Sequence, residues 1–423
     1  MTTALIGPFE AAAILIVLAA GLGYINHRFL RLPASVGLTF MGALASLAVI
    51  GIDYLLPGVR LSDMLADFLK GVDFQATLMN GMLSFLLFAG ALHVDWSDMR
   101  NGRWPILALS TLGVLISTAI VGIGFYYMAP LFGLHAPLTW CFVFGALISP
   151  TDPVAVMAVL KAAHVPRTLS ATVAGESLFN DGVGVVVFGI ALSIASGGEN
   201  FTIAHAVWDF VREAGGGVLL GLAAGWIAYA LMRSIDDYNV EAMISLAVVM
   251  GGYSLAQHIG VSGPVAMAVA GLIIGNAAAA QAMSDTTRDH VMKFWSLIDE
   301  ILNAVLFLLI GLEFVAVAQG GKLILLGAAA IPLVLLARFI SVGAPMLTLR
   351  PIIKLGPLAM PTLVWGGLRG GISVALALSI SQNEARSVLL AATYVVVLFA
   401  VLIQGGTISR VITRVKARHP ELT

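Results

Sequence analysis

The sequence predicts an all-α, polytopic membrane protein with about thirteen transmembrane helices. Of its 423 residues, 59% are hydrophobic and 11% are charged, whereas a soluble domain carries about 25% charged residues. The mean hydropathy is +0.98, and apolar runs recur that reach the roughly 20 residues needed to cross a bilayer. A single cysteine, Cys141, excludes a disulfide framework within the chain. The polar connections, the longest near 52–75 and 281–292, are too short to fold as separate soluble domains.

The expected spans follow one another with short connections. Their limits are read from the apolar runs. They lie near residues 8–26, 33–51, 76–94, 105–128, 138–160, 169–196, 206–232, 239–259, 262–280, 294–318, 323–347, 358–381 and 387–409.

Basic residues orient the predicted spans. Of the 22 lysines and arginines, fifteen fall in alternate connections or the tail and five on the opposite side, and the remaining two, Arg338 and Arg369, lie inside spans. Because cytoplasmic loops carry the excess of Lys and Arg, we expect the N-terminus outside and the C-terminus in the cytoplasm. The expected location is a bacterial inner membrane, and the expected surroundings are lipid, with no nucleic-acid partner.

The sixth span carries four polar side chains near its middle: Glu176, Ser177, Asn180 and Asp181. At about 100° per residue, Glu176 and Asn180 form one stripe, and Ser177 and Asp181 form its neighbour. Charged groups at bilayer depth are costly, and they usually line a watery path or pair with each other. This helix is therefore predicted to face the protein interior at a functional site.

Two spans are predicted to be broken. The fifth contains Ser149–Pro153, in which two prolines bracket Thr151 and Asp152, and the twelfth contains Gly366–Gly371, in which four glycines surround Leu368 and Arg369. Proline removes backbone donors and frees carbonyls, which is tolerated at membrane depth only beside protein or a water-filled cavity. Interrupted segments in corresponding positions of two halves indicate a transporter site and inverted repeats.

These residues permit ion exchange. Thr151, Asp152, Ser177 and Asp181 offer oxygen ligands for a hard cation, and carboxylates also serve proton relays. If Asp181 holds either a proton or a monovalent cation, competition for that one group suffices for antiport. The alternative interpretation is that Asp181 only pairs with an arginine.

Buried arginines need partners. For Arg369 we expect a structural ion pair with Glu176, which leaves Asp181 free to titrate. For Arg338 we expect Glu313 or Glu300 as the partner. Asn180 can hydrogen-bond the broken backbone without adding a second titrating charge, so one free acid favours electroneutral exchange.

Three motifs in this order resemble a known family. Ser149–Pro153 followed by Val154-Ala155-Val156, then Gly175–Gly182, then Gly366–Gly371, are similar to the NhaP-like branch of the monovalent cation/proton antiporter superfamily, whose Asn-Asp pair stands at residues 180–181. The resemblance extends over the whole chain and includes Gly311-Leu312-Glu313.

This resemblance implies an NhaA-like antiporter fold and a homodimer. Helices 1–3 and 7–10 (residues 1–104 and 206–320) would form the dimerisation scaffold. Helices 4–6 and 11–13 (residues 105–205 and 321–412) would form the core, which moves by an elevator-like step, and residues 413–423 would form a short cytoplasmic tail. It also implies a sodium site of Asp181, Asp152, Ser177 and the Thr151 backbone, with Arg369 holding Glu176.

One departure from the pattern is Ala89, which stands in the third span where relatives often have an acid. It leaves open whether sodium, lithium or potassium is preferred. No cofactor is expected beyond the transported cation and proton. Two other classes compete with an antiporter: a cation channel, although no repeated pore loop is found, and a membrane-embedded hydrolase using Asp152 and Asp181, although Arg369 and the broken spans have no role there. We therefore expect a transporter and not an enzyme.

Small residues mark one face of the seventh span at Gly217, Gly221 and Gly225. Such a ridge lets two helices approach closely. The sequence leaves open whether the neighbour belongs to the same protomer or to a second one.

Overall fold

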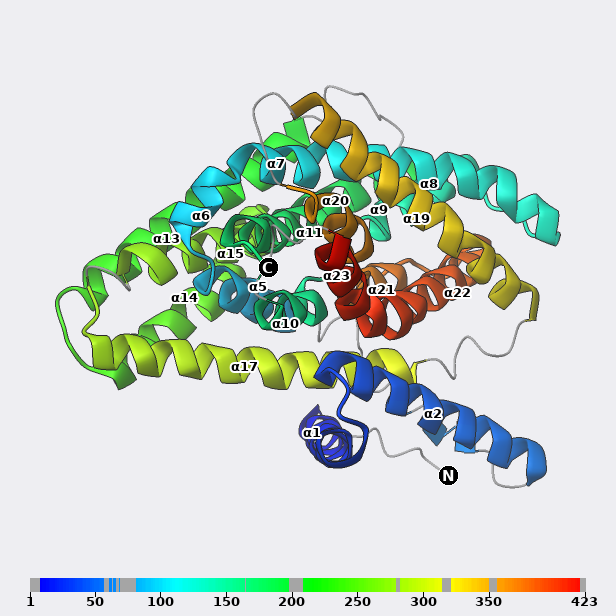
Figure 1. The fold of residues 1–423 in the computed structure, drawn as a ribbon, viewed down its shortest axis with the longest axis horizontal. Coiled ribbons are helices and arrows are strands. Elements are labelled where there is room, and N and C mark those ends of the chain that lie inside the picture. The colour runs from blue at the N-terminus through cyan, green and yellow to red at the C-terminus, as the bar shows by residue number, and fades with distance from the viewer. Residues whose placement is uncertain are drawn as a thin grey trace.

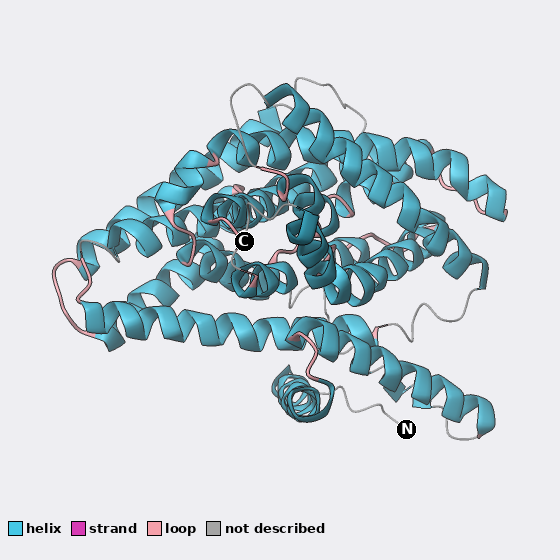
Figure 2. Cartoon of the chain, viewed as in Figure 1, coloured by secondary structure: helices cyan, strands magenta, loops and turns pink. Residues whose placement is uncertain are grey.

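The fold is entirely helical in the described part of the chain (Figure 2). The computed structural model describes residues 8–56, 61–62, 64–65, 68, 81–163, 165–197, 208–278, 282–313, 321–349 and 356–418. Short π-helical turns join several helices, as at Asn26–Leu30 between α1 and α2. The α-helices are α1 Pro8–Ile25, α2 Ala34–Leu55, α5 Leu83–Leu92, α6 Trp96–Asn101, α7 Arg103–Ala108, α8 Val114–Met128, α9 Leu138–Leu147, α10 Val154–Ala162, α11 Arg167–Ala195, α13 Gly216–Met232, α14 Tyr238–Ile259, α15 Gly263–Ile273, α17 Asp285–Leu312, α19 Gly321–Leu349, α20 Ala359–Trp365, α21 Gly371–Leu378, α22 Glu384–Phe399 and α23 Gly406–Arg418.

The predicted membrane character is confirmed. Among the described residues, nine helices are long and apolar enough to cross a membrane, and three shorter apolar helices accompany them. Each of the thirteen predicted spans overlaps one or more helices, although residues 76–80, 206–207, 279–280 and 314–318 of four of these spans lie outside the described part. The count of thirteen crossings stays a prediction.

Polar caps and prolines set where several helices begin. Asp237 accepts hydrogen bonds from the backbone of Asn239 and Val240 at the start of α14, and Asn383 accepts one from Arg386 at the start of α22. These side chains satisfy backbone donors that have no partner within the helix. Pro33, Pro137, Pro153 and Pro166 stand directly before α2, α9, α10 and α11.

Two glycines allow α2 to cross α17 closely (Figure 1). A Cβ on Gly42 would lie 2.9 Å from the Leu308 carbonyl oxygen, and Gly311 faces Gly42 across the crossing. Hydroxyls reinforce the contact: Thr39 donates to the Phe307 carbonyl at 3.0 Å and Ser46 to the Leu312 carbonyl at 2.7 Å. Small residues and hydroxyl bonds are the usual means of helix association in lipid.

The glycine ridge of α13 packs against α15 of the same protomer. A Cβ on Gly217 would lie 2.6 Å from the Ser262 carbonyl oxygen, and one on Gly225 would lie 2.8 Å from the Ile273 side chain. Gly221 likewise faces the Ala266 backbone. The ridge therefore serves packing within the protomer, and the alternative of a dimer contact at these glycines is wrong.

Two groups of helices meet along α17, the long helix across the lower half of Figure 1. On one side α5, α13, α14 and α15 pack together, and the N-terminal half of α17 joins them through Trp295. On the other side α8, α9, α19, α21 and α22 share an apolar core that includes Leu306–Ile310 of α17. Helix α17 thus borders both groups and runs past the centre of the molecule.

Candidate functional site

Two interrupted helices cross at the centre of the protein. Helix α9 ends at Leu147 and α10 begins at Val154, while α20 ends at Trp365 and α21 begins at Gly371. The extended segments between them form an isolated antiparallel bridge, in which the Asp152 amide donates to the Leu368 carbonyl at 2.8 Å. Both interruptions predicted from proline and glycine are therefore confirmed, and they lie side by side.

A glycine is required where the two segments touch. A Cβ on Gly370 would lie 2.6 Å from the Asp152 Cβ and 3.0 Å from its carboxyl carbon. On the other side of the crossing, Gly184 of α11 leaves room for the Pro150 ring. The close approach of these backbones places Thr151 and Asp152 against the middle of α11.

Helix α11 presents its polar stripe to the first interruption. Asn180 holds Thr151 through both ends of its amide: its oxygen accepts from the Thr151 amide at 3.2 Å, and its nitrogen donates to the Thr151 hydroxyl at 2.8 Å. The Thr151 and Ser177 hydroxyls lie 3.0 Å apart. All three side chains are buried. Asn180 therefore bonds broken-helix backbone through its oxygen, as predicted, whereas its nitrogen bonds side chains and not the backbone.

Glu176 pairs with Arg338, and the predicted pair with Arg369 is wrong. The Arg338 guanidinium donates to both carboxylate oxygens of Glu176, at 2.6 and 2.8 Å. Its Nε and Nη2 also donate to the Leu363 carbonyl at 3.0 and 2.8 Å. Helix α19 brings Arg338 beside the gap after α20, where a Cβ on Gly367 would collide with the guanidinium. The expectation that Arg338 would pair with Glu313 or Glu300 is also wrong, because Arg338 pairs with Glu176.

Arg369 is held by backbone carbonyls. Its Nη1 donates to the carbonyl of Ser149 and, at 3.1 Å, to that of Pro150. These are carbonyls that the proline interruption leaves without helical partners. The side chain is buried, and its Nη2 has no hydrogen-bond partner among the described residues. Arg369 thus joins the second interruption to the first instead of neutralising an acid by direct contact.

Asp181 follows Asn180 on α11 and has no partner in the part of the chain that the structure describes. It is 6% exposed, and none of the described residues gives it a hydrogen bond or ion pair. Its charge interacts with those of Asp152 and Glu176. Asp152 accepts a hydrogen bond from the Val154 amide at 2.9 Å through one carboxylate oxygen. The site therefore combines one unpartnered carboxylate, a second carboxylate and two hydroxyls, all oxygen groups of the kind that suit hard cations.

Helix α17 contributes a further acid that sequence reasoning missed. The charge of Asp299 interacts with that of Asp152, and Asn303, one turn later, donates to the Asp299 carboxylate at 3.0 Å. Leu306, on the same face, packs against Gly371 at the start of α21. An acid and an amide four residues apart inside an apolar span were the signal that could have pointed to this face.

Ala89 is fully buried in α5 beside Phe88, where it joins the apolar cluster of α13–α15. It supplies no oxygen atom from its side chain. Within the described part of the chain, no three acidic, histidine or cysteine side chains are grouped as they are in a resident metal site. The oxygen groups at the crossing come instead from a mixture of carboxylates, hydroxyls and backbone.

Crossed broken helices around a buried, unpartnered carboxylate define a class of membrane protein, the secondary transporters. The family model described as "Sodium/hydrogen exchanger, transmembrane" matches residues 14–414. The chain belongs to this family.

Relatives agree with this assignment. The Na⁺/H⁺ antiporter NhaP of Pseudomonas aeruginosa is 46% identical over 97% of this chain and 98% of its own. The Na⁺/H⁺ antiporter NhaG of Bacillus atrophaeus is 33% identical over 98% of this chain and 76% of its own. Among solved structures, the sodium proton antiporter MjNhaP1 of Methanocaldococcus jannaschii superposes with a TM-score of 0.75 at 19% identity, covering 96% of this chain and 98% of that one. The predicted antiporter fold is confirmed.

Proposed function

We propose that this protein is a secondary active sodium/proton antiporter in which the proton and a monovalent cation compete for Asp181. One observation carries the proposal: Asp181 is buried without a hydrogen bond or ion pair from the described residues. It lies one helical turn after Ser177, whose hydroxyl is 3.0 Å from that of Thr151. A carboxylate left unpaired in a low-dielectric site is costly unless a proton or a cation neutralises it. Binding of one therefore excludes binding of the other.

The charges at the crossing favour electroneutral exchange. Glu176 and Arg338 neutralise each other in a two-bond ion pair. Arg369 adds one positive charge, and Asp152 and Asp181 add two negative charges when both are ionised. These five side chains, without Asp299 of α17, then carry one excess negative charge, which a single proton or a single monovalent cation compensates. Because Asn180 is neutral, it adds no further titrating acid.

We assign the cation ligands to Asp181, Asp152, Ser177 and Thr151. Asn180 supports the site by fixing the Thr151 backbone and hydroxyl. The ion pair of Glu176 and Arg338 fixes α11 against α19, and Arg369 ties the two interruptions together. A sodium ion bound here is the substrate, and it leaves with each cycle.

The packing supports a division into scaffold and core. Residues 1–104 and 206–320 would form the dimerisation scaffold, and residues 105–205 and 321–412 would form the core that carries the ion. The close contacts of α13 with α15 and of α2 with α17 lie within the first group, and those of α8 with α9 and of α19 with α22 lie within the second. We propose a homodimer whose core moves past α17 in an elevator-like step, in the inner membrane of a bacterium.

Two positions, Ala89 and Asp299, bear on which ion is transported. Ala89 offers no carboxylate, and Asp299 reaches the site from a different helix. Sodium and lithium fit the small set of oxygen ligands, and potassium/proton exchange is the alternative that Ala89 leaves open.

Proteoliposomes with an imposed pH gradient test the function. Sodium, lithium and potassium are added in turn to wild type and to Asp181→Asn, with the membrane potential clamped and unclamped. Cation-triggered collapse of the gradient, lost in the variant and unaffected by the clamp, is the expected result. Cation conductance without proton movement would assign the protein to the channels instead.

A further inference from the structure

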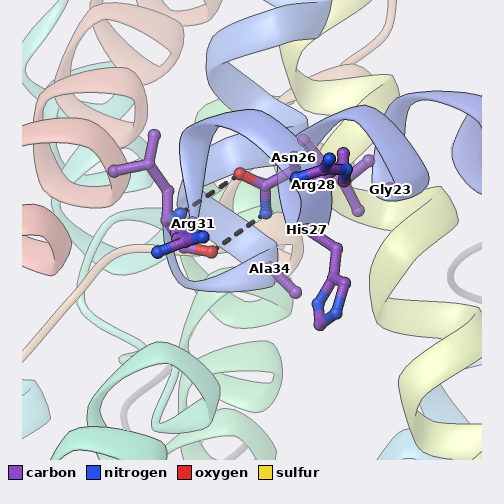
Figure 3. Close-up of a pocket in the computed structure, with 8 residues that line it drawn as sticks. Gly23, Asn26, His27, Arg28, Arg31 and Ala34 are labelled. Atoms are coloured by element: carbon purple, nitrogen blue, oxygen red, sulfur yellow. Dashed lines mark hydrogen bonds between the residues drawn. The ribbon is translucent and has the colours of Figure 1, made fainter.

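A cavity of about 680 Å³ opens where α1 ends and α2 begins. Among the described residues, its lining includes three basic side chains, His27, Arg28 and Arg31, and no acidic one. Figure 3 shows them grouped around the turn that joins the two helices. The volume falls within the roughly 300–1,000 Å³ typical of small-molecule sites. We propose that this cavity binds the phosphate of an anionic phospholipid headgroup.

The two arginines are available to a ligand. Neither guanidinium makes an ion pair or hydrogen bond with any described residue, and both side chains are exposed. The Arg28 guanidinium lies 5.8 Å from the Phe29 ring, its nearest ring contact. A guanidinium group suits phosphate because its planar donors match the phosphate oxygens. Basic residues that served only to orient the helices in the membrane would need positive charge but no cavity beside them.

The turn that presents these residues has an unusual backbone conformation, which hydrogen bonds hold in place. Arg31 adopts a left-handed conformation, φ 55° and ψ 30°, the one non-glycine residue to do so among those described. Its amide donates to the Asn26 carbonyl at 2.7 Å. The buried Asn26 side chain donates to the Leu32 carbonyl at 2.9 Å and accepts from the Leu32 amide at 3.3 Å (Figure 3). Backbone strain of this kind persists at ligand sites where the surroundings hold it in place.

The surroundings of the cavity match a lipid better than a free anion. Tyr24, at the end of α1, and Phe29, within the turn, are 68% and 71% exposed, so apolar surface for acyl chains adjoins the basic groups. Aromatic rings favour the level of the headgroups. The orientation predicted from the basic residues places this turn at the cytoplasmic leaflet, and basic pockets between helices on that side bind anionic headgroups.

Native mass spectrometry of the detergent-purified, delipidated protein tests the proposal. Phosphatidylglycerol and phosphatidylcholine are titrated separately, and the affinity of the first bound lipid is compared. We expect preference for phosphatidylglycerol, weakened about 30-fold in the double variant Arg28→Gln/Arg31→Gln, since each basic residue contributes about 1 kcal/mol. The control Arg233→Gln, an exposed arginine between α13 and α14, should leave binding unchanged.

Two further experiments test whether the lipid binds to a defined site. The first distinguishes such a site from non-specific attraction to positive charge, and the second distinguishes it from a site for free phosphate. Asn26→Ala keeps all the charges but releases the turn, so it should weaken binding while size-exclusion elution shows intact protein. A large excess of inorganic phosphate should not displace the lipid. Equal binding by wild type and the double variant, full binding by Asn26→Ala, or displacement by phosphate would each overturn the lipid site. Because the readout is lipid retention, failure here is independent of antiport.

Discussion

Removing the charge of Glu176 tests the architecture of the site. In Glu176→Gln, Arg338 loses the carboxylate that accepts two of its hydrogen bonds, at 2.6 and 2.8 Å, while its two bonds to Leu363 remain. Breaking a buried ion pair on one side costs about 3–5 kcal/mol, because a buried charge is left uncompensated. The bond from Asn180 to the remaining oxygen can persist, so we expect the lower end of this range.

The corresponding change in melting temperature follows from chain size. With 423 residues and an unfolding entropy of about 2.1 cal/mol/K per residue, a loss of about 3 kcal/mol lowers the Tm by about 3 °C. Helices that persist in the unfolded state in detergent reduce the entropy of unfolding. The decrease in Tm should therefore be at least about 3 °C. Intrinsic tryptophan fluorescence during heating of the detergent-solubilised protein measures it at one scan rate.

A second substitution identifies the partner. Glu176→Gln/Arg338→Gln removes both charges of the pair and should recover most of the lost stability. Glu176→Gln/Arg369→Gln should recover much less, because Arg369 bonds the Ser149 and Pro150 carbonyls and acts on the pair only through its charge. Recovery with the Arg369 substitution and not with the Arg338 one would refute the pairing described here.

Three other predictions concern separate parts of the structure. Asn180→Asp puts a second carboxylate at the position where the Asn180 nitrogen lies 3.1 Å from a Glu176 oxygen, so it should lower stability by about 2 kcal/mol or more and reduce exchange; an unchanged melting temperature would contradict this. Asp299→Asn should raise the apparent KM for the cation about two- to fivefold, since a partly exposed charge contributes roughly up to 1 kcal/mol, whereas Glu300→Gln on the exposed side should not; equal effects would deny Asp299 a role. Gly221→Leu should destabilise by about 1–3 kcal/mol through overpacking of α13 against α15, and Gly251→Leu, which meets no atom within 4 Å, serves as its thermal-melt control.

The sequence predicted the parts of the site whose signal is local. The proline pair of Ser149–Pro153 and the four glycines of Gly366–Gly371 each mark a break in a span, so both breaks could be located without a structure. Glycine alone is a weaker signal, because Gly215–Gly217 stay helical. The stripe of Glu176 and Asn180 followed from helical geometry alone. Asn180 was also expected to bond broken backbone, since its amide can both donate and accept.

Partners that depend on distances between helices could not be predicted. Two arginines lie inside spans, and only the packing of α19 beside the gap after α20 shows that Arg338 reaches Glu176. Arg369 donates its hydrogen bonds to backbone carbonyls. A search for its partner among the acidic residues alone could not find them. Asp299 was missed because the sequence does not show which of two adjacent acids in an uninterrupted helix faces the crossing. Asn303, four residues later, was the one mark of its face, and the neighbouring Glu300 is exposed. The glycines of α13 could have packed against a helix of the same protomer or of a second one, and only the position of α15 decides between the two.

Competition at Asp181 is tested most directly by counting protons released when the cation binds. Isothermal titration calorimetry of the detergent-solubilised protein with sodium, in buffers of different ionisation enthalpy, gives this count. Near the pH at which half of the sites are protonated, wild type should release about half a proton per sodium bound, rising toward one as the pH falls and the affinity weakens. Asp181→Asn should neither bind sodium measurably nor release protons. Sodium binding with no linked proton, or unaltered binding by Asp181→Asn, would contradict the proposed mechanism.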